Sequence, residues 1–417
     1  MQCMRVRTLK GLSRALVIIP SIFGHTGDVV NERLFLKSLC RGRYCLVISF
    51  IGPTRFTRLK KYLDKIIKGK LSREVGARNA VIIPMAIPHP DILVDIYMLL
   101  VSILLTPFIW ILDRLIQFDI IYVRTSLLAF GLLSVNSLSR KTCVKIITMR
   151  EDEVVRSPAK RLKRSLSLIY SLADRYALTK ARIIGVPTPI LLKRLIVRRG
   201  VLPKGKVALV PPGVDREEIE VLRRQTPKVK DNLHYIVGFV GGLAWWQGVD
   251  ILVQAVARLK DLQGKPVSLL IVGDGPERKK IEKLCKELKV SCHITGFVKH
   301  SKALKYLANF DVFVVPRPRM PNTESIIPIK VIEAWALGVP VITTRHEIYE
   351  LMGLRDKEDV IFCEPDPGDV AEKILMVIKN EELRKKLSVR GPQLAEGFYY
   401  DKIVANLINA FEDIKKN

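Results

Sequence analysis

The chain has 417 residues, of which 48% are apolar and 26% charged, and it contains no low-complexity tract and no internal repeat. This length and composition exclude a disordered chain and allow two or three domains with cores of their own. The net charge of +28 is uneven, because residues 1–213 hold 37 Lys/Arg and 12 Asp/Glu (+25) and the remainder holds 32 and 29 (+3).

Such a charge asymmetry favours an extended anionic partner for the first half of the chain. Nucleic acid and an anionic membrane surface are the two candidates. The seven cysteines are scattered without a C-x-x-C pair. We interpret them as reduced thiols of a cytosolic protein and expect neither a zinc site nor a disulfide framework.

The first predicted unit is a strand, a glycine-bearing loop and a helix. Residues 15–20 (ALVIIP) are a short apolar run that suits a strand better than a signal peptide, and we expect no signal peptide. Gly24 and Gly27 in the loop would let the backbone approach a ligand at the N-terminus of the following helix. Their spacing fits no dinucleotide fingerprint, so a plain turn is the alternative.

Two later segments of the first half suit a membrane surface. Residues 55–70 predict a helix with one apolar and one basic side, which fits an anionic interface or a solvated surface. Residues 92–112 are long and apolar enough to span a bilayer, with Asp95 as the sole charge. Because 118–123 and 143–148 predict further strands of the same sheet, we expect a buried or membrane-embedded helix instead of a span.

The rest of the chain alternates strands with helices, and Pro211-Pro212-Gly213 begins a linker. Glu151 follows the strand 143–148, at the sheet edge where open α/β sheets bind ligands. The alternation predicts two doubly wound α/β domains.

Residues 311–341 carry the clearest site pattern. A buried strand (312–315) precedes a loop with two arginines, and Pro328 then begins a helix that ends at Gly338. A helix N-terminus after such a loop is a usual anion site. Lys330 and Glu333 lie on one side of this helix, where a lysine suits phosphate and a carboxylate suits hydroxyl groups, as in a nucleotide-sugar. A surface Lys–Glu pair is the alternative.

Five segments of the second half, in this order, strengthen the interpretation: IVGFVGGLAWWQGVDILVQAVARL, LLIVGDGPERKKIEKL, ITGFV, FDVFVVP and PIKVIEAWALGVPVI. From about Val207 onward the chain resembles a family 4 retaining glycosyltransferase of the GT-B fold. The resemblance implies two Rossmann-like doubly wound domains that face a cleft, and no metal or other cofactor. Residues 1–212 would bind the acceptor, 213–396 the nucleotide-sugar, and 397–417 would form a helix that crosses back.

The resemblance also assigns roles to residues. Glu333 matches the acid that binds the ribose hydroxyls, Gly241 and Gly242 match the loop near the diphosphate, and Phe297 and Val298 match the stretch that contacts the base. Gln247, Ile327 and Pro328 complete the expected donor site. Gly24, Gly27 and Glu151 are the expected residues of the acceptor side.

Two departures from the family pattern change the expected chemistry. Ser325 stands where many members have a second acid, with Glu324 one place away, so the chain fits a P-x-K-x-x-E variant in which Lys330 contacts phosphate. Gly242 and Gln247 replace the usual arginine and lysine. The diphosphate charge must then be met by Lys330, by Arg317 or Arg319, and by helix N-termini. We predict Lys330, Arg317 and Glu324 as the catalytic residues and expect the six histidines to be isolated and structural.

The predicted function is that of a hexosyltransferase that retains configuration by front-face attack and stabilises the leaving diphosphate electrostatically. A lipid-linked acceptor is expected, reached by a cytoplasmic protein peripheral to the inner face of the cell membrane. A soluble transferase acting on a free sugar or glycan is the rival among enzymes. An inactive GT-B protein serving as a membrane or assembly platform is a second rival, and nucleic-acid binding ranks last because no known module is present.

Overall fold

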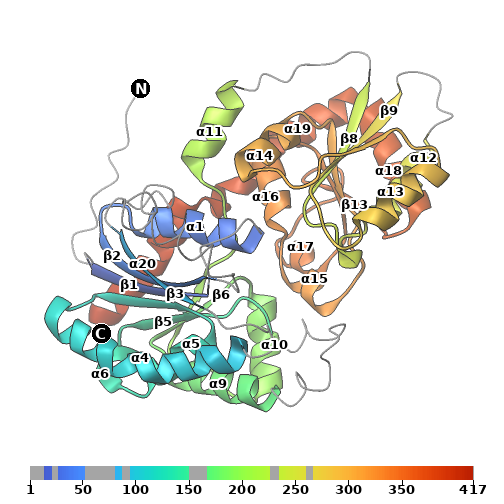
Figure 1. Ribbon diagram of the computed structural model, residues 1–417. Coiled ribbons are helices and arrows are strands. Elements are labelled where there is room, and N and C mark those ends of the chain that lie inside the picture. The colour runs from blue at the N-terminus through green and yellow to red at the C-terminus, as the bar shows by residue number, and fades with distance from the viewer. Residues whose placement is uncertain are drawn as a thin grey trace, which may run out of the picture. The chain divides into compact units, whose positions relative to one another are not determined.

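The computed structural model (Figure 1) describes residues 14–20, 27–51, 80–86, 94–149, 167–225, 234–259 and 266–416. The chain divides into two compact units. The first holds residues 1–24, 32–211 and 403–417, and the second holds 25–31 and 212–402. The predicted helix 55–70 and the predicted acceptor residues Gly24 and Glu151 lie outside the described residues, whereas Gly27 is the first residue of helix α1.

The first unit contains a seven-stranded parallel sheet in the order β3-β2-β1-β4-β5-β6-β7. Its strands are β1 (Arg14–Ile19), β2 (Tyr44–Ile51), β3 (Ala80–Ala86), β4 (Ile120–Arg124), β5 (Thr142–Lys145), β6 (Ile183–Val186) and β7 (Lys206–Leu209). Its helices are α1 (Gly27–Leu39), α4 (Val94–Ile116), α5 (Ser126–Leu133), α6 (Asn136–Ser139), α9 (Ser167–Lys180) and α10 (Pro189–Arg199).

The sheet of the first unit is covered on both faces, as its near-continuous apolar strands require. Leu16 and Ile18 of β1 point to a core formed with α4, α5, α9 and α10, which lie together on one face (Figure 1). On the other face Phe35 of α1 packs on Tyr122 of β4, with ring centroids 4.8 Å apart. The last helix, α20 (Tyr400–Lys416), joins this unit through an ion pair of 2.6 Å between Lys206 and Asp413.

The apolar segment predicted at 92–112 is helix α4. The strands before and after it, β3 and β4, belong to one sheet, in agreement with the connectivity argument. Residues 95–116 are long and apolar enough to cross a membrane, and only 28% of their most apolar window is buried. The helix therefore packs on the domain with only one side buried, and its predicted embedding in a membrane stays a prediction.

The expectation that all cysteines are free thiols is also wrong, because Cys40 and Cys45 form a disulfide. Cys40 follows α1 and Cys45 lies in β2, and the tight turn between these elements leaves the two Cα atoms 5.7 Å apart, within disulfide range. The spacing in sequence does not show this turn. These two cysteines therefore no longer support the expectation of a reducing compartment.

The second unit contains a six-stranded parallel sheet in the order β10-β9-β8-β11-β12-β13. Its strands are β8 (Tyr235–Val240), β9 (Val267–Val272), β10 (Cys292–Ile294), β11 (Val312–Val315), β12 (Val341–Thr344) and β13 (Ile361–Cys363). Its helices are α11 (Arg216–Gln225), α12 (Val249–Ala257), α13 (Arg278–Glu287), α14 (His300–Ala308), α15 (Pro321–Ser325), α16 (Ile329–Ala336), α17 (Glu347–Leu351), α18 (Pro367–Lys379) and α19 (Glu381–Ala395), with short 3-10 turns at Trp245–Gln247 and Glu396–Phe398. Both sheets change direction of winding at their first strand, so the predicted doubly wound architecture is confirmed.

One strand residue of the second sheet has no room for a side chain. A Cβ atom at Gly238 in β8 would overlap the ring of Phe310, which is buried and stacks on Phe313 at 6.5 Å between ring centroids. Overpacking of this kind usually costs about 1–3 kcal/mol. Glycine is therefore required here by packing and not by backbone conformation.

We expect Gly238→Ala to lower the free energy of unfolding by about 1–3 kcal/mol, because Phe310 must leave its rotamer to admit the methyl group. Urea denaturation of the full chain measures the change. Gly397→Ala is the matched control, since a Cβ atom there meets nothing within 4 Å. Equal stability of the two variants would contradict the packing argument.

Candidate active site

Helix α16 begins at the end of the loop that follows β11. Pro328 is its N-cap, and no side chain caps the first N–H groups. Six consecutive residues, Val331–Ala336, are buried, so the helix is held firmly in the core. The helix ends at Ala336, and Gly338 two residues later has a left-handed φ of 69° and donates its N–H to the Trp335 carbonyl, which closes the helix end. The sequence prediction for this segment is confirmed.

The carboxylate of Glu333 lies buried one turn into α16 and is 1% exposed. His300 Nε2 lies 2.8 Å from Oε1, in a hydrogen bond, and Lys330 Nζ lies 2.9 Å from Oε2, in an ion pair. Oε2 makes no hydrogen bond of good geometry and so keeps capacity to accept one. Burial alone would raise the pKa of Glu333, but the charges of Lys330 and His300 lower it to about 2.

His300 is the residue that sequence reasoning missed. It begins α14, directly after the predicted base-contacting residues, and its Nδ1 lies 3.7 Å from Glu218 of α11. Burial lowers its pKa, yet the carboxylates of Glu333 and Glu218 raise it to about 9, so the ring is charged at neutral pH. The expectation that the histidines are isolated is therefore wrong for His300. Only the packing of α14 on α16 could have revealed the contact.

Glu333, Lys330, His300 and Glu218 form a charge cluster, and the pH dependence of the unfolding free energy tests it. Since the pKa of His300 is raised from 6.5 to about 9 on folding, its contribution is fully present below pH 6.5 and is lost as the pH rises through 9. We expect His300→Gln to remove about 2–3 kcal/mol of unfolding free energy at pH 6 and much less at pH 10. Denaturation at both pH values measures this, with His293→Gln on the exposed part of β10 as control. A loss that is independent of pH would contradict a charged His300.

A second pair joins two loops of the second unit. Arg317 Nε donates to Gln247 Oε1 at 2.9 Å, and Gly248 packs directly against the backbone of Pro316. Burial lowers the pKa of Arg317 to about 10. The structure thus brings together the predicted donor residue Gln247 and the predicted catalytic residue Arg317.

Glu324 is held in a different set of contacts. Its Oε2 accepts from the backbone N–H of Glu347 at 2.6 Å, and its Oε1 lies 3.4 Å from His346 and 3.7 Å from Arg319. Arg319 also pairs with Glu364 at 3.1 Å. These contacts tie α15 to the start of α17.

Of the remaining predicted donor residues, Gly241 and Gly242 follow β8, Phe297 and Val298 follow β10, and Ile327 and Pro328 precede α16. Gly241 has a φ of 156°, which glycine adopts readily. A Cβ atom at the exposed Gly242 would meet only the carbonyl of Asp274, at 4.0 Å. Phe297 is 54% exposed, whereas Ile327 is buried at 4%. Val298 is partly buried between Phe297 and the start of α14. Small residues and an exposed aromatic ring at the carboxyl ends of parallel strands are the usual surroundings of a nucleotide.

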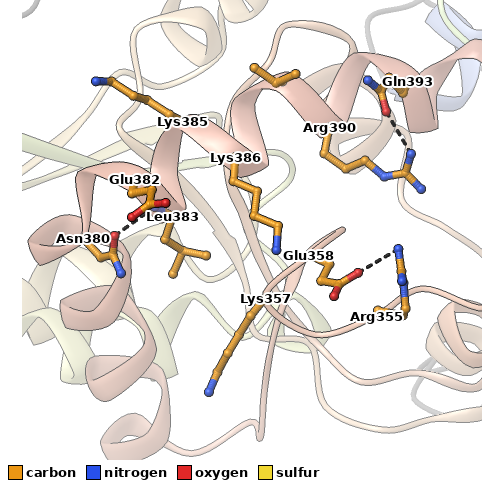
Figure 2. A pocket seen from close by; sticks show the side chains of 11 residues that line it. Arg355, Lys357, Glu358, Asn380, Glu382, Leu383, Lys385, Lys386, Arg390 and Gln393 are labelled. Atoms are coloured by element: carbon orange, nitrogen blue, oxygen red, sulfur yellow. Dashed lines mark hydrogen bonds and ion pairs between the residues drawn. The ribbon is translucent and has the colours of Figure 1, made fainter.

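A basic pocket of about 850 Å³ lies elsewhere in the second unit. Figure 2 shows the side chains that line it. It lies between α19 and the turn at 355–358, and none of the predicted donor residues lines it. Several of its charges are already paired, as in the contacts of Arg355 with Glu358 (2.7 Å) and Arg390 with Gln393 (2.9 Å). We therefore assign it no part in donor binding. Within the described ranges no group of three or more His, Cys, Asp and Glu could hold a metal ion.

The sequence of the second unit resembles known glycosyltransferases. Residues 219–394 match the family model for glycosyl transferases group 1. A lipopolysaccharide core biosynthesis glycosyltransferase of Rhizobium meliloti is 32% identical over 165 residues, which cover 39% of this chain and 45% of that protein. The chain matches about half the length of such curated relatives. The second unit therefore contains a glycosyltransferase group 1 domain.

Two solved structures show that the likeness of the fold extends over the whole chain. Sucrose-phosphate synthase from Thermosynechococcus elongatus has a TM-score of 0.69 and 16% identity, over 97% of this chain and 99% of that one. Anabaena Alr3699/HepE, solved in complex with UDP and glucose, has a TM-score of 0.64 and 14% identity, over 96% and 99%. The predicted fold class, GT-B with two Rossmann-like domains, is confirmed.

Proposed function

We propose that the protein is a glycosyltransferase that moves a sugar from a nucleotide-sugar donor to an acceptor with retention of configuration. The observation that carries the proposal is the buried Glu333 carboxylate, held ionised by Lys330 and His300 at the start of α16. A carboxylate with a free lone pair accepts hydrogen bonds from ribose hydroxyls, and these charge-assisted bonds are strong. The group 1 match, which includes all three residues, supports this role.

Besides Glu333, Lys330 has a second proposed partner, the diphosphate of a bound donor. The Lys330 side chain is 18% exposed, and its ammonium pairs with the carboxylate of Glu333, three residues further along the helix. The uncapped N–H groups of α16 favour an anion at the same place. Lys330 would therefore contact the diphosphate and stabilise the negative charge that develops when the bond from the sugar to phosphate breaks.

Arg317 supplies a further positive charge from the other loop. Gln247 holds its guanidinium at 2.9 Å, so the arginine is positioned before a donor binds. This contact offers a replacement for the lysine that is missing from the loop after β8. The contact also counts against the alternative of an inactive platform protein, because that alternative depends on the absence of a basic side chain from this loop. Glu324 would act by holding the loop of Arg319 against α17.

The acceptor that we propose is lipid-linked and reached at the inner face of the cell membrane. Support comes from the charge of +25 on residues 1–213 and from the lipopolysaccharide enzyme among the relatives. Retention would follow from front-face attack assisted by a donor phosphate oxygen, without a metal ion. A soluble transferase acting on a free sugar or glycan is the alternative, and turnover of the purified chain without lipid would favour it.

A binding experiment tests the donor part of the proposal. Thermal unfolding of the full chain is measured with UDP-, GDP- and ADP-sugars at millimolar concentration, since a ligand that binds only the folded state raises the melting temperature. We expect one nucleotide class to raise it in the wild type and not in Glu333→Gln. A panel in which every nucleotide-sugar leaves the melting temperature unchanged would contradict the proposal.

A further inference from the structure

One side of helix α4 is apolar and exposed from Leu100 to Leu115. Seven large apolar side chains on this side are 39–76% exposed: Leu100, Ile103, Leu104, Phe108, Trp110, Ile111 and Leu115. At 3.6 residues per turn these positions share one face of the helix. Arg114 is the only charged residue among them, and its guanidinium lies over the ring of Trp110 at 5.2 Å. We call these eight residues the α4 face.

The opposite side of α4 packs against the core of the first unit. Met98, Val101 and Ile109 are at most 5% exposed and belong to the core under the sheet. Near the N-terminal end, Asp95 accepts a hydrogen bond of 2.5 Å from Tyr170 of α9. Near the C-terminal end, Asp113 pairs with Lys141 at 3.0 Å. Both ends are therefore fixed to the same unit, and the helix lies along its surface (Figure 1).

This attachment excludes a membrane span. A spanning helix must place its two ends on opposite sides of a hydrocarbon layer about 30 Å thick. Here β3 and β4, which precede and follow α4, are strands of one sheet, and both ends of α4 bond to side chains of that unit. A bilayer can therefore meet α4 only sideways, with the helix axis in the membrane plane.

Two further leucines are exposed on helix α9, whose Tyr170 bonds to Asp95 of α4. Leu168 and Leu172 of α9 are 72% and 62% exposed, and they lie one turn apart on the same side of that helix. Arg175, the next exposed residue on this side, is basic. Exposed leucines with arginine at the edge, and tryptophan beside them, form the usual composition of a membrane-interface surface.

We infer that the α4 face inserts, parallel to the membrane plane, into the boundary between the headgroups and acyl chains of an anionic bilayer. Charge selects this occupant over a second copy of the chain. A symmetric dimer through the α4 face would bring together two units whose residues 1–213 each carry +25, whereas anionic lipid neutralises that charge. The inference deepens the proposed function, on whose lipid-linked acceptor it rests, by naming the surface that meets the membrane.

Vesicle binding of the full chain tests the inference. The probe is vesicles of phosphatidylcholine and phosphatidylglycerol at 3:1, collected by sedimentation. The double variant Leu104→Glu/Ile111→Glu changes two exposed side chains, so folding is expected to survive, and it should lower vesicle binding at least about tenfold. Leu351→Glu/Val389→Glu is the matched control, because it adds the same charge at exposed apolar positions of the second unit. This control should bind like the wild type.

Lipid contact itself is measured by fluorescence. Brominated acyl chains should quench the tryptophan emission of the wild type, and Trp110→Phe should remove most of this quenching. Equal vesicle binding by the wild type and the Leu104/Ile111 variant, or no binding by the wild type, would overturn the inference. So would a wild-type dimer that the variant converts to a monomer. Nucleotide-sugar binding on the same preparations separates the two proposals, since it should be unchanged in every α4 variant.

Discussion

Replacing Lys330 by alanine is expected to lower turnover about 10²–10³-fold while donor affinity falls much less. The reason is that its charge matters most when negative charge develops on the departing phosphate. In the unliganded protein the same charge is balanced by Glu333 at 2.9 Å, so the side chain is already in position. Steady-state nucleotide release with saturating donor measures the effect.

The control for this variant is Lys305→Ala, an exposed lysine of α14 outside the charge cluster. It should keep wild-type turnover. If Lys330→Ala keeps its turnover within a few-fold of wild type, then Lys330 is not the phosphate contact. Arg317, held by Gln247, would then be the better assignment.

Glu333→Gln is expected to weaken donor binding about 10²-fold or more. The amide keeps the shape of the side chain but loses the negative charge, and each charge-assisted bond to a ribose hydroxyl is worth about 1.5–3 kcal/mol. Lys330 and the charged His300 would also face a neutral partner in a buried place. Isothermal calorimetry with the donor found by the nucleotide panel measures the loss.

Glu287→Gln on the exposed side of α13 provides the same chemical change away from the site and should leave donor affinity unaltered. The temperature of unfolding of both variants shows that they are folded at the assay temperature. Unchanged donor affinity in folded Glu333→Gln would remove Glu333 from the donor site.

The sheets and α16 could be predicted from the sequence because their signals are local. Apolar runs such as 312–315 are buried strands, and the interval from Pro328 to Gly338 marks both ends of a helix. The contact of His300 with Glu333 has no local signal. It joins residues 33 apart and exists only because α14 packs beside α16.

Helix α4 shows a different limit. Almost every residue from 96 to 112 is apolar, so periodicity cannot tell a buried side from an exposed one. Tertiary bonds at Asp95 and Asp113 decide which side faces the core. Likewise, nothing in the spacing of Cys40 and Cys45 reveals the turn that joins them. Features that depend on two elements meeting could not be predicted from either element alone.

Nucleotide release by the full purified chain tests the proposed transferase activity most directly. UDP-, GDP- and ADP-sugars are supplied one at a time with anionic vesicles that carry a lipid-extract acceptor fraction, and the freed nucleotide is measured for the wild type and for Lys330→Ala. We expect release from one nucleotide class by the wild type and release at least about 10²-fold slower by the variant. Equal release by the two proteins, or none from any donor that the folded chain binds, would contradict the proposal.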